Sequence, residues 1–276
     1  MRNIRWLASV TLAVFAVDAA QAAPSLERGD YLVNSIMACG SCHTPQGPEG
    51  PMPGMGLTGQ LVENTEAFTA VAPNITPASR IADWSDAELM RAIREGIRPD
   101  GSVIGPPMPF EVYKHISDDD LASVVLYLRT VPAVESDPGV SEYRMPLPPA
   151  YGPPIESVAA VPEGVTVEYG AYLAGPLGHC IVCHSPIGPQ GADIEGQLGL
   201  GGNAFHGPWG VSVSPNITPV GLANYSDAEL ETMITKGVRP NGSRMLPPMS
   251  YPHYARMTDN DLDALVLYLR ALPPKP

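Results

Sequence analysis

The sequence predicts an all-α protein built from two similar domains in tandem. The first observation is a repeat, because residues of the amino-terminal half recur 141 positions later, as Tyr31 and Tyr172 do. The second is a set of helix start signals in each half, without an alternating apolar and polar run long enough for a strand. Each copy is long enough to bury its own core, so the repeat indicates two domains rather than a solenoid.

The spacing between the two copies changes once along the chain. We align two landmarks from each copy and expect a loop of different length between them. The aligned pairs are Gly59-Gln-Leu61 with Gly196-Gln-Leu198, and Asn74-Ile-Thr-Pro77 with Asn216-Ile-Thr-Pro219. From Trp84 and Tyr225 onward the separation is again 141 residues.

Two helices in each half have clear start and stop signals. Ser85-Asp-Ala-Glu88 and Ser226-Asp-Ala-Glu229 have the capping-box pattern, and Gly96 and Gly237 are placed to end those helices. A final helix begins in each copy at a Ser or Thr followed by acidic residues, and carries one apolar face. The apolar positions are Leu121, Val124, Val125 and Leu128 in the first copy and Leu262, Leu265, Val266 and Leu269 in the second.

The chain divides into four segments. Residues 1–22 have the pattern of an export signal, with Arg2 and Arg5 before an apolar stretch and a cleavage site near Ala22. The domains are then expected at 23–131 and 163–276. The proline-rich segment 132–162 between them is expected to be an extended linker, either a loose tether or a strap across both domains.

Each copy contains one Cys-x-x-Cys-His motif, and together the motifs use all four cysteines. They are Cys39-Gly-Ser-Cys42-His43 and Cys180-Ile-Val-Cys183-His184. Such a cysteine pair can bond to the two vinyl groups of a haem, and the adjacent histidine is then held beneath the iron as an axial ligand. The sequence therefore predicts two covalently bound haem c groups.

Cysteine pairs with this spacing also occur in zinc sites and thiol-disulfide enzymes. A zinc site would have to combine pairs from separate repeats, and a redox dithiol would be expected between a strand and a helix. The histidine after each second cysteine favours haem.

The repeat also selects the second axial ligand of each haem. Of the methionines, only Met108 and Met249 occupy equivalent positions, each in a Pro-Pro-Met sequence. A thioether is a soft ligand that suits low-spin haem iron and raises its potential. His115 and His253 have no histidine counterpart, which disfavours two histidine ligands in both copies. Packing is the alternative role of these methionines.

The formal net charge of −13 argues against nucleic-acid binding and favours a basic face on a protein partner. The apolar stretch after Arg5 is short for a membrane span and does not recur, so we expect an exported, periplasmic protein without a stable span in the mature chain. Retention of the segment as an anchor is the alternative. Haem attachment through cysteines also fits export from the reducing cytoplasm.

These residues resemble the class I cytochromes c, in which an amino-terminal helix leads to the attachment motif and crosses a carboxy-terminal helix. Gly29 and Gly170 would permit that close crossing, with Tyr127 and Tyr268 as packing candidates. More narrowly, motifs such as Asn-Ile-Thr-Pro, Trp-Ser-Asp-Ala-Glu-Leu, Gly-Ile-Arg-Pro-Asp-Gly and Pro-Pro-Met look like those of cytochrome subunits of periplasmic alcohol and gluconate dehydrogenases and some molybdenum hydroxylases. The alcohol and gluconate subunits typically carry three haem motifs, whereas this chain has two.

The resemblance implies electron transfer from a dehydrogenase toward a cytochrome or terminal oxidase, without a catalytic residue in this chain. We also expect Arg98 and Arg239 to donate hydrogen bonds to the haem propionates, because buried carboxylates need partners. The alternative is a dihaem enzyme such as a cytochrome c peroxidase, in which one axial ligand is displaceable.

Overall fold

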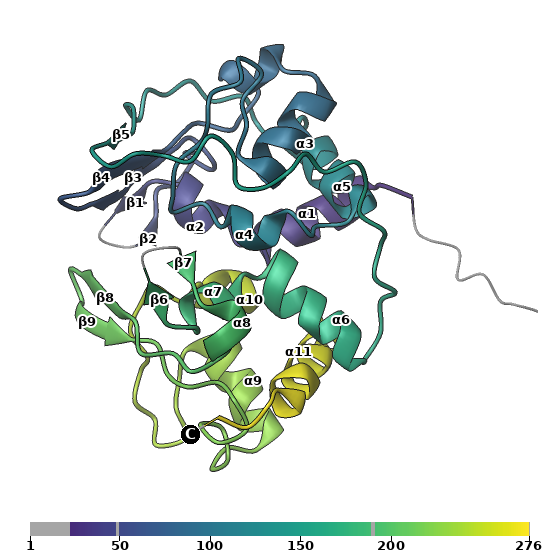
Figure 1. The fold of residues 1–276 in the computed structure, drawn as a ribbon, viewed down its shortest axis with the longest axis vertical. Helices are drawn as coiled ribbons and strands as arrows, with labels where there is room; N and C mark the ends of the chain where they lie inside the picture. Colours follow the sequence, from purple (N-terminus) through teal and green to yellow (C-terminus); the bar gives the residue numbers. More distant parts are fainter. Residues whose placement is uncertain (1–22, 48–49, 189–190, 276) are drawn as a thin grey trace, which may run out of the picture.

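The computed structural model describes residues 23–47, 50–188 and 191–275, which form two lobes (Figure 1). The predicted export signal at 1–22 lies outside these residues. The helices of the first lobe are α1 (Leu26–Asn34), α2 (Cys39–His43), η1 (Arg80–Asp83), α3 (Asp86–Glu95), α4 (Phe110–Tyr113) and α5 (Asp118–Leu128). Those of the second are α6 (Val167–Tyr172), η2 (Leu173–Leu177), α7 (Cys180–Cys183), α8 (Ile194–Gln197), α9 (Asp227–Lys236), α10 (Tyr251–Tyr254) and α11 (Asp259–Ala271).

The predicted helix signals are confirmed in both lobes. Ser85 and Glu88 form a complete capping box at the start of α3, and Ser226 and Glu229 do the same at α9. Gly96 and Gly237 end the two helices in the left-handed conformation, with φ of 69° and 61°. None of the described helices has the length and apolar character needed to cross a membrane.

In each lobe the first helix crosses the last helix at a glycine. A Cβ on Gly29 of α1 would lie 2.1 Å from the carbonyl oxygen of Ser123 and 2.7 Å from Cβ of Tyr127 in α5. A Cβ on Gly170 of α6 would lie 2.0 Å from the carbonyl oxygen of Ala264 in α11. The backbones therefore touch at a distance that only glycine permits, and the predicted helix crossing is confirmed.

The prediction of an all-α protein is wrong, because the described residues also include short antiparallel strands. The first lobe holds β1 (Gln46–Gly47), β2 (Gly50–Pro51), β3 (Gln60–Asn64), β4 (Phe68–Ala72) and β5 (Glu142–Tyr143), and the second holds β6 (Ile187–Gly188), β7 (Gly191–Ala192), β8 (Ala204–Gly207) and β9 (Gly210–Val213). They are two to five residues long, pair as β1-β2, β3-β4-β5, β6-β7 and β8-β9, and lie on the same side of the two lobes (Figure 1). Strands this short carry too few side chains to show an alternating pattern.

The backbone corrects one part of the repeat alignment. The N–H of Gly59 donates to the carbonyl of His43, and the N–H of Gly201, not Gly196, donates to the carbonyl of His184. Similarly, the N–H of Ile75 binds the carbonyl of Leu57, and that of Ile217 binds the carbonyl of Gly199. The segments 57–77 and 199–219 are therefore equivalent at a constant separation of 142 residues, and the length difference precedes them.

The proline-rich segment after α5 is a strap along the first lobe. The carbonyl of Val134 accepts hydrogen bonds from Asn74 and Thr76, and β5 adds a third strand to β4. Near the other end of the segment, Asp118 at the start of α5 accepts a hydrogen bond from the N–H of Val158. Of the two expectations, loose tether or strap, the structure favours a strap, and these contacts join it to the first lobe.

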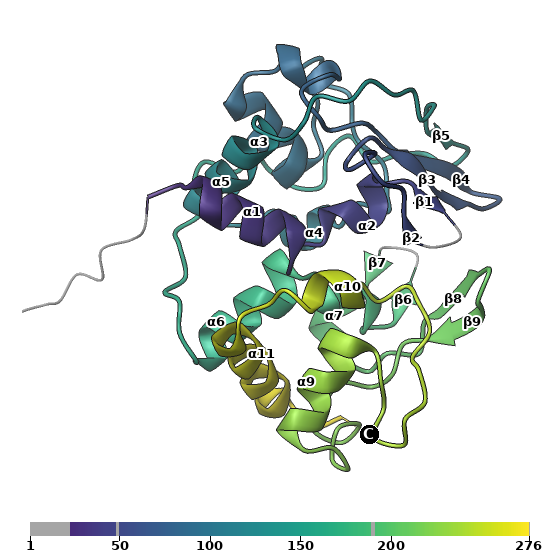
Figure 2. The ribbon, with the colours of Figure 1, turned by 180° about the vertical axis from the view of Figure 1, so that it is seen from behind.

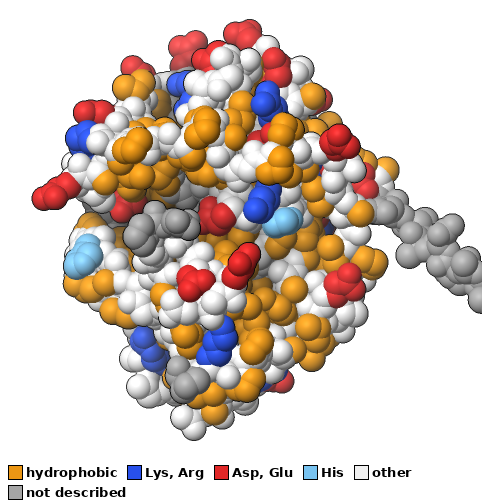
Figure 3. Space-filling view, in the orientation of Figure 1, with side chains coloured by type: hydrophobic (Ala, Val, Ile, Leu, Met, Phe, Trp, Pro, Cys, Tyr) orange, Lys and Arg blue, Asp and Glu red, His pale blue; other side chains and the backbone are white. Residues whose placement is uncertain are grey.

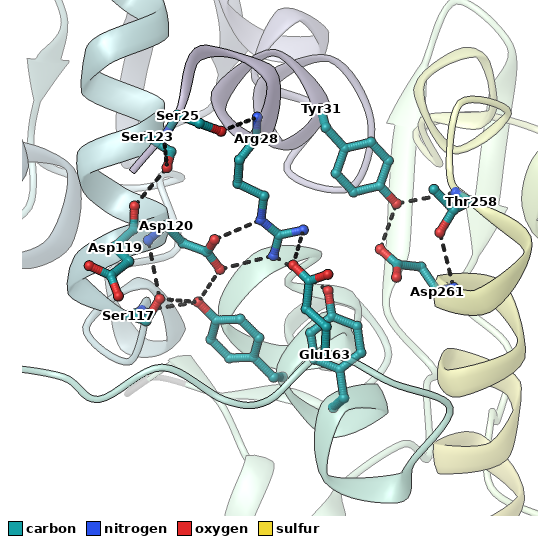
Figure 4. A network of polar contacts seen from close by, with 12 residues as sticks. Ser25, Arg28, Tyr31, Ser117, Asp119, Asp120, Ser123, Glu163, Thr258 and Asp261 are labelled. Carbon is teal, nitrogen blue, oxygen red and sulfur yellow. Dashed lines mark hydrogen bonds and ion pairs between the residues drawn. The ribbon is translucent and has the colours of Figure 1, made fainter. Parts of the chain in front are cut away.

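The lobes contact each other through equivalent residues (Figures 2 and 4). The hydroxyl of Tyr31 donates to Asp261 at 2.6 Å, and that of Tyr172 donates to Asp120 at 2.8 Å. Tyr172 is the counterpart of Tyr31 in the repeat, and Asp261 is that of Asp120. Arg28 meets its own counterpart, with 3.4 Å between its Nη2 and Oη of Tyr169. A local two-fold axis between Arg28 and Tyr169 accounts for this reciprocal pattern.

Candidate haem-attachment sites

Both Cys-x-x-Cys-His motifs form a short helix entered through a left-handed residue. Ala38 precedes α2 with φ of 47°, and His179 precedes α7 with φ of 42°. A hydrogen bond from N–H to the carbonyl five residues earlier precedes each of them, from Met37 to Leu32 and from Gly178 to Leu173. The same irregular turn thus places both motifs at the end of the first helix of each lobe.

The motif histidines are fixed by the same backbone contact in both lobes. Nδ1 of His43 lies 2.9 Å from the carbonyl oxygen of Pro73, and Nδ1 of His184 lies 2.9 Å from that of Pro215. A carbonyl can only accept, so Nδ1 carries the proton and Nε2 keeps a free lone pair. Burial lowers the pKa of both imidazoles, which also favours the neutral, ligating form.

The motif cysteines are free thiols next to the apolar core. Cys39 and Cys180 are half-buried and pack against buried hydrophobic residues. Burial raises the pKa of each of these thiols to about 12. Addition of a thiol to a vinyl group gives a neutral thioether, which an apolar site accommodates at no cost in buried charge, and the apolar wall suits a porphyrin. The donor set and its setting therefore fit haem c.

A buried tyrosine was missed beside each motif. Tyr113 and Tyr254 are both almost inaccessible, and burial together with the charges of the motif cysteines raises the pKa of each phenol well above its usual value. Because these tyrosines are separated by 141 residues, the repeat itself was the signal that could have identified them. Pro73 and Pro215 act through a backbone carbonyl, which their side chains do not reveal.

Met108 and Met249 are half-buried and pack against the core from equivalent loops. Each loop follows the turn that ends α3 or α9 and precedes α4 or α10. The packing places them in the apolar interior of the correct lobe, which both axial ligation and simple packing require.

Arg98 and Arg239 occupy equivalent tight loops. Arg98 Nη1 donates to the hydroxyl of Ser102 and the carbonyl of Val103, whereas Arg239 Nη1 donates to the carbonyl of Arg244. Burial and the positive charge of Arg80 lower the pKa of Arg98. Both side chains are partly exposed and are not consumed by an ion pair with any described residue.

The two motifs approach each other across the lobe interface. The ring of Tyr113 in the first lobe lies edge-on to that of His179, with 6.0 Å between centroids. A Cβ on Gly40, inside the first motif, would lie 3.0 Å from Nε2 of His253 in the second lobe. Burial, followed by the nearby charge of Cys42, raises the pKa of Cys183 to about 11. The attachment helices therefore face each other.

Family models match both lobes. Residues 24–128 match the model described as cytochrome c oxidase, cbb3-type, subunit III, and residues 167–273 match the model described as cytochrome c. The chain is a cytochrome c with two domains. It binds two haem c groups covalently, through Cys39 and Cys42 in the first domain and Cys180 and Cys183 in the second.

Curated relatives align along nearly the whole cytochrome. A fructose dehydrogenase cytochrome subunit of Gluconobacter japonicus is 29% identical over 274 residues, which cover 91% of this chain and 53% of the relative. The cytochrome c subunit of a quinone-dependent alcohol dehydrogenase of Gluconobacter oxydans is 28% identical, with 91% and 55% covered. A dihaem c-type cytochrome of Cereibacter sphaeroides is 28% identical, with 85% and 82% covered. The chain thus spans about half the length of the two dehydrogenase subunits.

Proposed function

We propose that this cytochrome is an exported electron-transfer protein that passes single electrons from a partner dehydrogenase toward a respiratory cytochrome or oxidase. The observation that carries the proposal is the duplicated site: two attachment motifs with identically anchored histidines, facing each other across one interface. The names of the relatives, several of which are cytochrome subunits of dehydrogenases, support it.

Haem iron, when bound, cycles between ferric and ferrous states and so accepts and releases one electron at a time. The chain supplies the ligands. We assign Nε2 of His43 and His184 as the proximal ligands and the sulfur of Met108 and Met249 as the distal ligands. The proline carbonyls orient the imidazoles, since their hydrogen bonds hold Nδ1 and fix the ring plane. Arg98 and Arg239 are assigned to the propionates.

The interface supports a relay between the two domains. Because its hydrogen bonds are reciprocal and its helices pack through buried residues, the two sites are held at a fixed separation. A fixed separation lets an electron enter one domain and leave from the other without diffusion of a second protein. No side chain of the described residues is assigned a catalytic role in this proposal.

The periplasm is the proposed location. The pattern of residues 1–22, the requirement for haem attachment outside the reducing cytoplasm, and the names of the relatives support it. We propose residues 23–131 and 163–276 as the two domains and the segment between them as the strap that joins them.

The deciding experiment measures covalent haem and the methionine-to-iron band of the ferric protein, before and after peroxide, in protein matured by a haem-attaching host. The proposal predicts two haems and two methionine bands per chain, both unchanged by peroxide. A missing band with a high-spin, peroxide-sensitive signal would instead assign one domain to catalysis.

A further inference from the structure

The strap covers an edge of the first domain as a third strand. In this sheet Phe68 pairs with Tyr143 and Thr69 with Glu142. The hydroxyl of Ser141 accepts from the N–H of Val71 at 2.9 Å and donates to the carbonyl of the same residue at 3.1 Å. The outer edge of β4 is thus satisfied by the chain itself.

Two tyrosines of the strap also cover the loop that carries Met108. The ring of Tyr143 fills the space at Gly105, where a Cβ would lie 2.3 Å from it, and its hydroxyl donates to the carbonyl of Pro106. The ring of Tyr151 stacks on Phe110 with 4.9 Å between centroids, and Phe110 is only 1% exposed.

In the second domain the equivalent edge is open. β9 is the counterpart of β4, and none of the described residues forms a strand on its outer side. Val211 and Val213 are 51% and 58% exposed. The N–H of Ser214 points to Asn203 across the hairpin, so by the alternation of strand backbones the N–H groups of Val211 and Val213 point outward.

The neighbouring loop of the second domain is open too. Leu246, which is 44% exposed, stands where the first domain has the buried Gly105. Tyr251 replaces Phe110, is only half-buried, and donates its hydroxyl to the carbonyl of Leu246. Hydrophobic side chains are visible over β8 and β9 on the face shown in Figure 3. Because Leu246 has a side chain, a tyrosine cannot dock there as Tyr143 does.

We propose that the outer edge of β9 and the adjoining Leu246 loop bind an extended, carboxylate-bearing segment of a partner protein, which adds a third strand to the β8-β9 hairpin. The strap of the first domain is the template, since it binds the equivalent edge in extended form. Its acidic character, from Glu135, Asp137 and Glu142, would suit the exposed Arg244 of the second domain. The proposal concerns a protein-binding surface and does not depend on the proposed redox role.

The test uses the haem-loaded protein and a synthetic peptide of residues 135–144 in which Tyr143→Ala makes room for Leu246. Amide hydrogen exchange is measured residue by residue. With the peptide at about ten times its Kd, exchange at Val211 and Val213 should slow about tenfold, because exchange then requires the free tenth of the molecules. Exchange at Val71, whose N–H is already bonded, should not change.

A pair of variants separates strand addition from loose contact. Val213→Pro removes an outward N–H that the hairpin does not use, and should abolish the effect of the peptide, whereas Val213→Ala should retain it. The proposal is overturned if the peptide leaves both amides unchanged, or if Val213→Pro responds like the native chain. Protection in dilute, peptide-free protein would assign the edge to this chain's own residues, and protection that grows with protein concentration would assign it to a second copy.

Discussion

The hydroxyl of Tyr31 in the first domain donates a hydrogen bond of 2.6 Å to Asp261 in the second, and it also accepts one from the N–H of Thr258. The counterpart Tyr172 makes both contacts in the opposite direction, with Asp120 and the N–H of Ser117 (Figure 4). Asp120 and Asp261 are buried, so each carboxylate depends on this partner. Two tyrosines therefore hold the domains together through the first residues of the last helix of each.

Replacing Tyr31 and Tyr172 by phenylalanine should uncouple the domains. Each change removes a hydrogen bond to a buried carboxylate, at a cost of about 1–3 kcal/mol in free energy of unfolding. We expect the double variant to unfold in urea in two separate transitions. Tyr127→Phe is the matched control, because its hydroxyl bonds to Asn34 within one domain. A single transition at the native midpoint would contradict the role given to the tyrosines.

The same contact predicts a loss of stability at high pH. Burial first, and the Asp261 carboxylate second, raise the pKa of Tyr31 to about 12 from its ordinary value of 10. Between pH 10 and 12 the unfolded chain loses this proton and the folded chain keeps it, so unfolding becomes easier as pH rises. Tyr31→Phe should lose less stability over this range than the native protein. Equal losses in urea titrations at about pH 9 and pH 11.5 would rule out this contribution.

Gly29→Ala and Gly170→Ala should each disrupt the helix crossing of one domain. The added Cβ would lie about 2 Å from a carbonyl oxygen of the facing helix, so the helices must separate. We expect a loss of at least about 1–3 kcal/mol in the free energy of unfolding, and reduced haem incorporation in that domain alone. Gly56→Ala is the control, since nothing lies within 4 Å of a Cβ built there.

Met108→Leu and Met249→Leu should each remove one of the two methionine-to-iron bands and lower the potential of one haem. Leucine keeps the apolar volume but supplies no sulfur, and loss of the thioether removes the preference for the ferrous state. Met90→Leu, which lies against the core in α3 and has Glu231 as its counterpart, should leave both bands. Two intact bands in Met108→Leu would mean that this methionine only packs.

Arg98→Leu should lower the potential of the haem in the first domain, because a cation near the propionates favours the reduced state. Arg98→Lys should restore most of the native value. Arg91→Leu removes a charge from an exposed ion pair with Glu95 and serves as the control. A redox titration of Arg98→Leu that matches the native curve would contradict the assignment to propionate.

The fold was predictable where the signal is local or repeated. The capping residues of α3 and α9 act within one turn, and the glycines at the helix crossings recur in both copies, so sequence alone identifies them. The small sheets were missed because a strand such as β5 is two residues long and owes its conformation to β4, which lies far away in the sequence. For the same reason sequence could not distinguish a tether from a strap.

The site shows the same division. The cysteines and histidines follow from one contiguous motif, whereas the carbonyls of Pro73 and Pro215 become relevant only when the chain folds back. Matching Gly59 with Gly196 was wrong because the shared Gly-Gln-Leu letters outweighed a backbone role, namely donation to the histidine carbonyl, that Gly201 performs.

The meeting of Arg28 with Tyr169 on the local axis has an evolutionary consequence. In a homodimer of a single-domain ancestor, the residue at this position would face an identical copy of itself, and two arginines there would repel each other. Fusion of the two genes removes that constraint, because each half can then mutate alone. An arginine opposite a tyrosine, with Asp120 and Glu163 beside it, is an asymmetry that only a duplicated and fused chain can encode.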